Sequence, residues 1–211
     1  MADRIIVVGG GGFGRELMCW LEDCTAAGTL PPLAGFLDDS PLELPRYAPR
    51  LGSIQDFTPR AGDLFALAIA KPETKRKITG LLKDRGGRFV SVVHPSAIVV
   101  RTAHLGEGVV LYPQALVTSD SSIGNFVTIL NTSSIGHDSI LGDFSTISAL
   151  CNVMGNVTVG ADVFLGSGAR LLPNIKIGDG ASIGAGVTAL RSVKSGNTLY
   201  AAPPKILKFT S

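Results

Sequence analysis

Three histidines, His94, His104 and His137, are the side chains of this chain best suited to acid–base chemistry. The unperturbed pKa of imidazole lies near neutrality, so histidine can accept a proton under physiological conditions and release it again. His137 differs from the other two because a carboxylate, Asp138, follows it directly. His137 is therefore the candidate general base.

A glycine-rich loop near the N-terminus indicates a second kind of chemistry, phosphate binding. Gly9, Gly11 and Gly14 satisfy the pattern G-x-G-x-x-G directly after an apolar run, and Asp38 and Asp39 end the next apolar run. Such a loop usually indicates a dinucleotide, with the acidic residue on base or ribose. The first 92 residues are too few for both halves of a complete NAD-binding domain. They predict a site for a single nucleotide.

Residues beside this loop extend the predicted nucleotide site. We expect backbone N–H groups of Gly11, Gly12 and Phe13 to meet pyrophosphate oxygens. Lys71, at the end of a third apolar run, is a further candidate for this site. The charged stretch that continues from it to residue 85 is expected to be a helix with a solvated face.

The first 92 residues have the alternating pattern of an α/β unit. Apolar runs at 4–8, 34–37 and 64–70 predict strands, and helices are expected at about 15–27 and 73–84. Alternating strands and helices predict a small parallel sheet, a Rossmann-like half domain, whose ligands bind at the carboxyl ends of the strands. Both the glycine loop and Lys71 fall at such ends.

From Val93 onward the chain repeats every six residues. Sixteen of the seventeen residues at this spacing are Val, Ile or Leu, and the position four residues later is small or β-branched. The aliphatic series is Val93, Val99, Leu105, Leu111, Val117, Ile123, Ile129, Ile135, Leu141, Ile147, Val153, Val159, Leu165, Leu171, Ile177, Ile183 and Ala189.

A strict period of six excludes an α-helix, because 3.6 residues per turn would sweep the aliphatic position around the helix surface. A solenoid of short strands satisfies it, with one strand and one corner per hexad and the aliphatic residue inside. Glycine often follows the aliphatic residue and is expected to relieve the backbone at the corner. We therefore predict an α/β domain at 1–92 and an all-β parallel β-helix with a C-terminal tail at 93–211.

Composition narrows the class of protein. The formal net charge of +2 and the 6% of aromatic residues argue against a protein that coats nucleic acid or anionic membranes. No apolar run approaches the ~20 residues of a membrane helix, and the N-terminus does not resemble a signal peptide, so we expect a cytoplasmic protein without membrane insertion. The three cysteines form no C-x-x-C pair, and neither a disulfide framework nor a metal site is expected.

The repeat and its flanking motifs resemble a known family. The hexad [Leu/Ile/Val]-Gly-x-x-[small]-x is typical of left-handed parallel β-helix acyltransferases, in which three hexads form one coil of eighteen residues. A glycine-rich α/β module before the helix, Gly136-His137-Asp138 within it and Ala202-Pro203-Pro204-Lys205 at its end are similar to bacterial nucleotide-aminosugar N-acetyltransferases and sialic acid O-acetyltransferases.

The resemblance implies transfer of an acetyl group from acetyl-coenzyme A to the amine of a nucleotide-linked sugar, of the 4-amino-4,6-dideoxy type. It assigns His137 as general base and Asp138 as the carboxylate that orients the imidazole. It also implies a homotrimer with active sites between neighbouring chains. Thr146 stands where relatives often carry a second histidine, and it is expected to hydrogen-bond the sugar.

Coil arithmetic extends the expected coenzyme site. Residues eighteen apart stack at about 4.8 Å per coil, which places Gly155, Pro173 and Arg191 in line with His137. Gly155 leaves space for the ligand, and its N–H is a candidate donor to the thioester carbonyl. Arg191, Lys194 and Lys205 are candidate partners for the phosphates of coenzyme A.

Other functions remain open on the sequence alone. The same histidine would serve an O-acetyltransferase acting on a sialic acid or another sugar hydroxyl. A zinc-dependent carbonic anhydrase would need three histidines around one ion, yet the three here occupy different hexad positions. A non-catalytic protein that binds nucleotide sugars is the third alternative.

Overall fold

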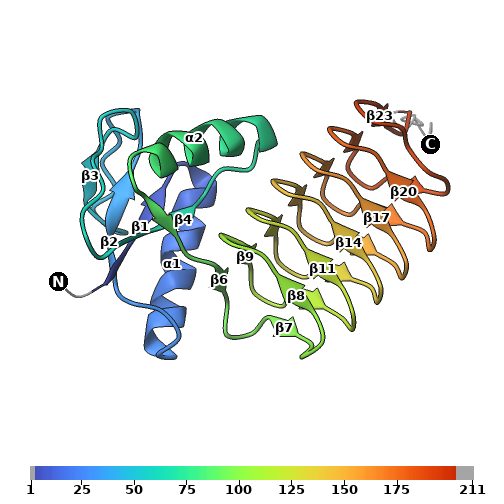
Figure 1. Ribbon diagram of the computed structural model, residues 1–211, viewed down its shortest axis with the longest axis horizontal. Coiled ribbons are helices and arrows are strands. Elements are labelled where there is room, and N and C mark those ends of the chain that lie inside the picture. Colours follow the sequence, from blue (N-terminus) through green and yellow to red (C-terminus); the bar gives the residue numbers. More distant parts are fainter. Residues whose placement is uncertain (1–2, 203–211) are drawn as a thin grey trace, which may run out of the picture.

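The computed structural model describes residues 3–202, and Lys205 lies outside this range. The first part of the chain forms a five-stranded parallel sheet in the order β3-β2-β1-β4-β5, with two helices (Figure 1). Its elements are β1 (Arg4–Val8), α1 (Gly12–Ala26), β2 (Leu33–Leu37), β3 (Arg50–Gly52), β4 (Asp63–Leu67), α2 (Pro72–Asp84) and β5 (Arg88–Phe89).

Local sequence explains where the two helices begin. Helix α1 starts at Gly12, three residues earlier than expected, so the glycine-rich loop leads directly into its first turn. Helix α2 starts at Pro72, whose missing N–H costs nothing at the first helical position and whose fixed φ suits a helix. Both helices follow the carboxyl end of a buried strand, β1 or β4. Strands β3 and β5 were not predicted, because they are short and lack a continuous apolar run.

The remainder of the chain is a parallel β-helix of two-residue strands in three sheets, as the hexads predicted. One sheet contains β6 (Val92–Val93), β9 (Val110–Leu111), β12 (Thr128–Ile129), β15 (Thr146–Ile147), β18 (Phe164–Leu165), β21 (Ser182–Ile183) and β23 (Thr198–Leu199). The second contains β7 (Ile98–Val99), β10 (Leu116–Val117), β13 (Ser134–Ile135), β16 (Asn152–Val153), β19 (Arg170–Leu171) and β22 (Thr188–Ala189). The third contains β8 (His104–Leu105), β11 (Ser122–Ile123), β14 (Ile140–Leu141), β17 (Thr158–Val159) and β20 (Lys176–Ile177).

The aliphatic position of each hexad lies inside this prism. From Leu111 to Ala189 every residue of the series is at most 1% exposed. The strands of successive coils pair eighteen residues apart, as in Ile135 with Val153. At the C-terminal end the register shortens to sixteen residues, because Ser182 pairs with Thr198.

The glycines that follow the aliphatic residues have a different role from the expected one. Gly136 and Gly142 do not adopt left-handed backbone conformations. A Cβ atom at either glycine would lie 2.5 Å from backbone atoms of the next coil. Glycine is needed here for close stacking of the coils. The left-handed conformation falls two residues later, as at Asp138, where φ is 56°.

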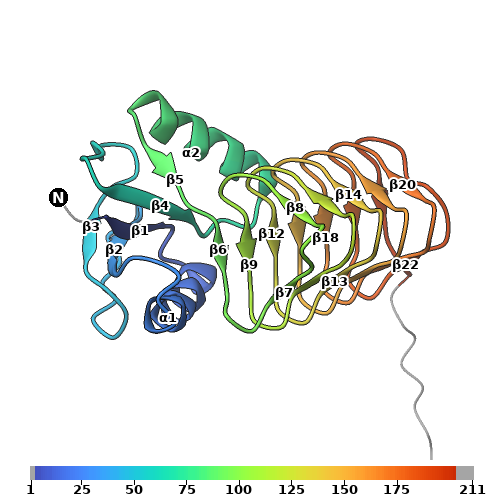
Figure 2. The same ribbon diagram turned by 60° about the horizontal axis from the view of Figure 1, so that its bottom comes forward.

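The α/β part packs against one face of the prism, the sheet of β6, β9, β12, β15, β18, β21 and β23, which we call the docking sheet. Tyr112, just after β9, donates from its hydroxyl to the carbonyl of Phe13 at 3.1 Å. Thr146 in β15 donates to the carbonyl of Ala70 at 2.7 Å. Figure 2 shows α2 lying beside the first coils of the β-helix. The carboxyl ends of β1 and β4 therefore face the docking sheet.

Candidate active site

His137 and Asp138 form a hydrogen-bonded pair at a corner between β13 and β14. Nδ1 of His137 lies 2.7 Å from a carboxylate oxygen of Asp138, and the two side chains are 62% and 54% exposed. A carboxylate acceptor at Nδ1 favours the tautomer with its proton on that atom. The lone pair of Nε2 can then accept a proton from a substrate that reaches this exposed side of the ring.

Gly155 lies directly beside the free nitrogen of His137. A Cβ atom at Gly155 would lie 2.5 Å from Nε2 and 2.6 Å from Cε1. The missing side chain thus makes room for the imidazole, and not for the coenzyme as the coil spacing predicts. Any larger residue at 155 would displace His137.

Other predicted coenzyme residues follow along the same edge of the prism. Pro173 and Arg191 occupy the corner position of the next coils, and both are exposed. Together with His137 and Gly155 they define what we call the His137 edge. Lys194 is also exposed. Lys205 lies outside the described residues.

The predicted nucleotide residues lie together at the carboxyl ends of the α/β sheet. One carboxylate oxygen of Asp38 accepts a hydrogen bond from the N–H of Gly10 at 2.7 Å, and the other accepts one from Ser40 at 2.8 Å. Asp38 therefore braces the glycine-rich loop. Gly11 and Gly12 are exposed beside it, with N–H groups at the start of α1.

Asp39 and Phe13 make contacts within the chain. Asp39 accepts hydrogen bonds from the hydroxyl of Ser53 at 2.8 Å and from the N–H of Gln55 at 3.1 Å. Partial burial raises the pKa of the Asp39 carboxyl, but these hydrogen bonds outweigh it and the net pKa is lowered. The ring of Phe13 packs at 5.3 Å from that of Tyr112. Both side chains are thus held by contacts within the chain, close to the glycine-rich loop.

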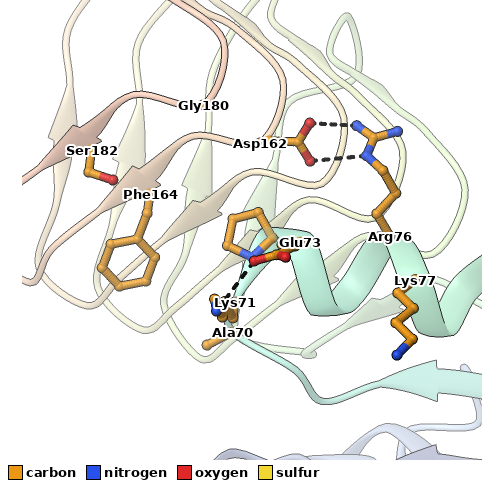
Figure 3. A pocket seen from close by; sticks show the side chains of 10 residues that line it. Ala70, Lys71, Glu73, Arg76, Lys77, Asp162, Phe164, Gly180 and Ser182 are labelled. Carbon is orange, nitrogen blue, oxygen red and sulfur yellow. Dashed lines mark hydrogen bonds and ion pairs between the residues drawn. The ribbon is translucent and has the colours of Figure 1, made fainter. Parts of the chain in front are cut away.

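A cavity of about 810 Å³ opens where the start of α2 meets the docking sheet (Figure 3). Phe164 and Ser182 form its floor on β18 and β21, and Lys71 and Glu73 form its wall. The ammonium of Lys71 lies 3.3 Å from the carboxylate of Glu73. The cavity therefore combines an aromatic surface with exposed charges of both signs.

A second ion pair closes the side of this cavity. Arg76 donates to both carboxylate oxygens of Asp162, at 2.7 and 3.3 Å. Of these lining residues, only Lys71 is predicted from the sequence. The others are ordinary surface residues in their own segments, and only the packing of α2 on the β-helix brings them together.

Thr146 is placed differently from the expectation. It is 1% exposed, and its hydroxyl donates to the carbonyl of Ala70. In the structure it joins the α/β part to the docking sheet, and its hydroxyl is not presented to a sugar. The threonine at this strand position faces the end of β4, which no signal within the repeat predicts.

One chain does not bring the two groups of residues together. His137 lies between β13 and β14, on the two sheets other than the docking sheet. In a three-sided prism, the edge between two sheets is opposite the third sheet. The glycine loop and the cavity, which adjoin the docking sheet, therefore lie on the side away from His137.

Neither a metal cluster nor a membrane helix is found in residues 3–202. No group of three or more His, Cys, Asp or Glu side chains could hold a metal ion within this range. The helices there are too short or too polar to cross a membrane. Cys151, in contrast, is a core residue, whose thiol donates to the carbonyl of Gly166 at 3.2 Å and whose pKa is raised by burial.

Comparison with known families gives a local match to the repeat. Residues 156–189 match the family described as bacterial transferase hexapeptide, six repeats. No curated protein sequence matches the chain.

Solved structures match the chain over its whole length. A mutant of perosamine N-acetyltransferase from Caulobacter crescentus, solved with CoA and GDP-perosamine, is 26% identical with a TM-score of 0.86, covering 99% of each chain. WeeI from Acinetobacter baumannii is 29% identical with a TM-score of 0.85, covering 98% of this chain and 100% of its own. The acetyltransferase domain of PglB from Neisseria gonorrhoeae, in complex with acetyl coenzyme A, is 26% identical with a TM-score of 0.85, covering 98% and 100%. These matches confirm that the chain resembles the sugar N-acetyltransferases built on hexapeptide repeats.

Proposed function

We propose that this protein is an acetyl-CoA-dependent N-acetyltransferase acting on a nucleotide-linked amino sugar. The observation that carries the proposal is the His137–Asp138 pair, whose free Nε2 faces solvent on a β-helix edge. The full-length similarity to acetyltransferases that bind CoA supports it.

The reaction needs one base and no covalent intermediate on the protein. The acceptor amine attacks the thioester carbon, and its proton passes to Nε2 of His137. The tetrahedral intermediate then collapses by breaking the carbon–sulfur bond, and the imidazolium returns the proton to the departing thiolate of coenzyme A. The Asp138 carboxylate holds the imidazole in the required tautomer and stabilises its charged form.

The coenzyme follows the His137 edge in this proposal. Among the hydrogen bonds of the described residues none is donated by the Gly155 N–H, so this group is available to the thioester oxygen as negative charge develops. Arg191 and Lys194, further along the β-helix, carry positive charge for the phosphates. We also assign a phosphate contact to Lys205 from the sequence.

The acceptor binds to the α/β part, which we propose as a Rossmann-like half domain of residues 1–92, separate from the left-handed β-helix domain of 93–211. The loop at Gly11, Gly12 and Phe13 would hold the phosphates with its N–H groups. Asp38 braces that loop, and Lys71 places positive charge at the neighbouring cavity. GDP-perosamine, bound by the relative from Caulobacter crescentus, is an acceptor of this class.

We propose that the active site is shared between chains of a homotrimer. The loop and cavity of one chain lie on the side of its prism away from its own His137, so a second chain must supply the base. Exposed apolar side chains on the other two sheets, Ile98 at 61% and Ile140 at 52%, are suited to contacts between prisms. We place the enzyme in the cytoplasm, where acetyl-CoA and nucleotide sugars are available.

The proposal is tested by incubating the protein with acetyl-CoA and a panel of nucleotide-linked 4-amino-4,6-dideoxy sugars. Matched sugars with a hydroxyl in place of the amine serve as controls. Thiol release with the amino sugars alone supports N-acetylation, and release with the hydroxyl sugars instead would favour O-acetylation. Binding of the sugars without any thiol release would make the protein a non-catalytic receptor.

A further inference from the structure

Lys75, the fourth residue of α2, is a fully buried lysine. Its side chain is 0% exposed, although the sequence predicted a solvated face for this helix. Its ammonium donates to the carbonyl of Phe126 at 3.1 Å, the hydroxyl of Thr128 at 2.9 Å and the carbonyl of Ser145 at 3.1 Å. An ammonium has three donors, and all three are used.

Burial of this charge needs an explanation beyond packing. Within the described residues, no carboxylate lies at ion-pairing distance from the Lys75 ammonium, and Asp162, which influences it electrostatically, is paired with Arg76. Transfer of a charged group from water to the interior costs several kcal/mol unless hydrogen-bond partners replace its hydration. An apolar side chain would fill the same space without that cost, so packing alone does not explain a lysine here. Directional bonds from a buried polar group, however, fix one arrangement of two elements.

The bonds of Lys75 fix the position of α2 along the β-helix. Phe126 and Thr128 belong to one coil and Ser145 to the next, so the ammonium bridges two coils. Beside it, the guanidinium of Arg76 stacks 4.2 Å from the ring centre of Phe144. A slide of α2 along its axis would break all of these contacts at once.

The aromatic residues beneath α2 have an unfavourable backbone. Phe126 and Phe144 have φ values of 57° and 63°, in the left-handed region that bulky side chains avoid. Their rings stack at 5.1 Å and 16°, and Lys83 lies 4.9 Å above the ring of Phe126. Both rings therefore contribute to a surface that receives the cationic face of α2.

The same anchoring sets the wall of the cavity. Thr146 holds the carbonyl of Ala70 before the helix, and Lys75 holds the end of the first turn. Between these two anchors lie Lys71 and Glu73, which face Phe164 across the cavity. The distance between wall and floor therefore depends on Lys75.

We propose that Lys75 is a positioning residue for the acceptor: by tying α2 to two coils of the β-helix, it holds the cavity wall in the geometry that binds the nucleotide-linked sugar. This inference rests on the proposed acetyltransferase function. Lys75 does not contact the substrate, and the coenzyme edge is on another side of the prism. Its loss should therefore affect one substrate and leave the other unchanged.

The experiment compares Lys75→Met with Lys83→Met, the same change on the same helix. Lys83 pairs with Glu107 where both side chains are more than 40% exposed, and it does not line the cavity. We expect Lys75→Met to raise the KM for the sugar by about tenfold, with kcat and the KM for acetyl-CoA within about twofold of wild type. Lys83 also contacts the β-helix, through Phe126 and Glu107, but these contacts are solvent-exposed and lie at the end of α2 away from the cavity. Lys83→Met should therefore change each of the three parameters by less than about twofold.

A milder variant keeps the test decisive if Lys75→Met fails to fold. Thr128→Val removes one acceptor of the ammonium, and it should raise the same KM by a smaller factor. A variant that lowers the melting temperature but keeps the sugar KM of wild type would make Lys75 purely structural and overturn the inference. If the wild-type protein shows no turnover, the proposed function is refuted. The anchoring of α2 is then tested separately by amide hydrogen exchange of residues 70–76. This exchange should accelerate in Lys75→Met and not in Lys83→Met.

Discussion

Replacement of Gly155 by alanine should displace His137 without disturbing the fold. The added methyl group would lie 2.5 Å from Nε2, whereas ordinary contact begins at 3.4 Å. The imidazole must therefore withdraw by roughly 1 Å, a misplacement that can cost about 10²-fold in rate. Gly155 does not have the left-handed backbone that strains alanine, and the exposed imidazole is free to move. We expect kcat to fall by about 10- to 100-fold with the melting temperature nearly unchanged.

The assay measures thiol release at saturating concentrations of both substrates, for wild type, Gly155→Ala and a matched control. Gly80→Ala is that control, because its methyl group meets no atom within 4 Å and the change removes a glycine from α2. The double variant Gly155→Ala with His137→Ala identifies the cause. If displacement of the base explains the loss, the double variant is no slower than His137→Ala. A further large loss would show that residue 155 obstructs the coenzyme, and a wild-type kcat in Gly155→Ala would refute the assigned position of the base.

Three other perturbations test separate parts of the account. His137→Ala should lower kcat by about 10²–10⁴-fold and recover partly at high pH, where more acceptor is free amine; unchanged kcat would exclude His137 as base. Asp38→Ala removes the acceptor of the Gly10 N–H and so loosens the glycine-rich loop. It should raise the KM for the nucleotide sugar and leave the KM for acetyl-CoA unchanged. Equal effects on both KM values would contradict separate sites for the two substrates. Burial lowers the pKa of Lys75 from 10.5 to about 7, opposed by Asp162, so between these values the unfolded chain holds a proton that the folded chain has released. The neutral amine that remains in the folded chain keeps two N–H donors for its partners on the β-helix. The unfolding free energy of wild type should then rise with pH across this window relative to Lys75→Met, in thermal melts from about pH 6 to about pH 9; a difference that stays constant would contradict the burial argument.

The β-helix could be predicted because its stabilising pattern is local and repeated. Every hexad has the same pattern, with an aliphatic residue inside the prism and a small residue beside it. One hexad that departs from this pattern does not obscure the fold, because the neighbouring hexads still show it. His137 could also be located, because a corner position in such a repeat points outward. The predicted role of the glycines is wrong. Gly136 is needed because a side chain there would clash with the next coil, not because its own backbone conformation requires glycine. The sequence pattern alone does not distinguish these two reasons.

The junction between the two parts of the chain could not be predicted. In the sequence, nothing distinguishes Lys75 from the other charged residues of its helix. Its burial depends on carbonyl groups more than fifty residues away along the chain. Thr146 follows the repeat in every respect, yet the end of β4 covers it. The cavity has the same origin, since Phe164 and Lys71 meet only because α2 packs on the docking sheet. Such contacts depend on tertiary geometry and leave no periodic signal in the sequence.

A crystal structure of the protein with coenzyme A and a nucleotide-linked amino sugar would show whether His137 of a neighbouring chain reaches the acceptor amine. The distance to measure joins the acceptor amine and Nε2 of His137. We predict a distance of about 2.6–3.2 Å, with the histidine on a different chain from the glycine-rich loop that holds the nucleotide. An amine beyond the reach of any His137, or a nucleotide and histidine that meet within one chain, would contradict it.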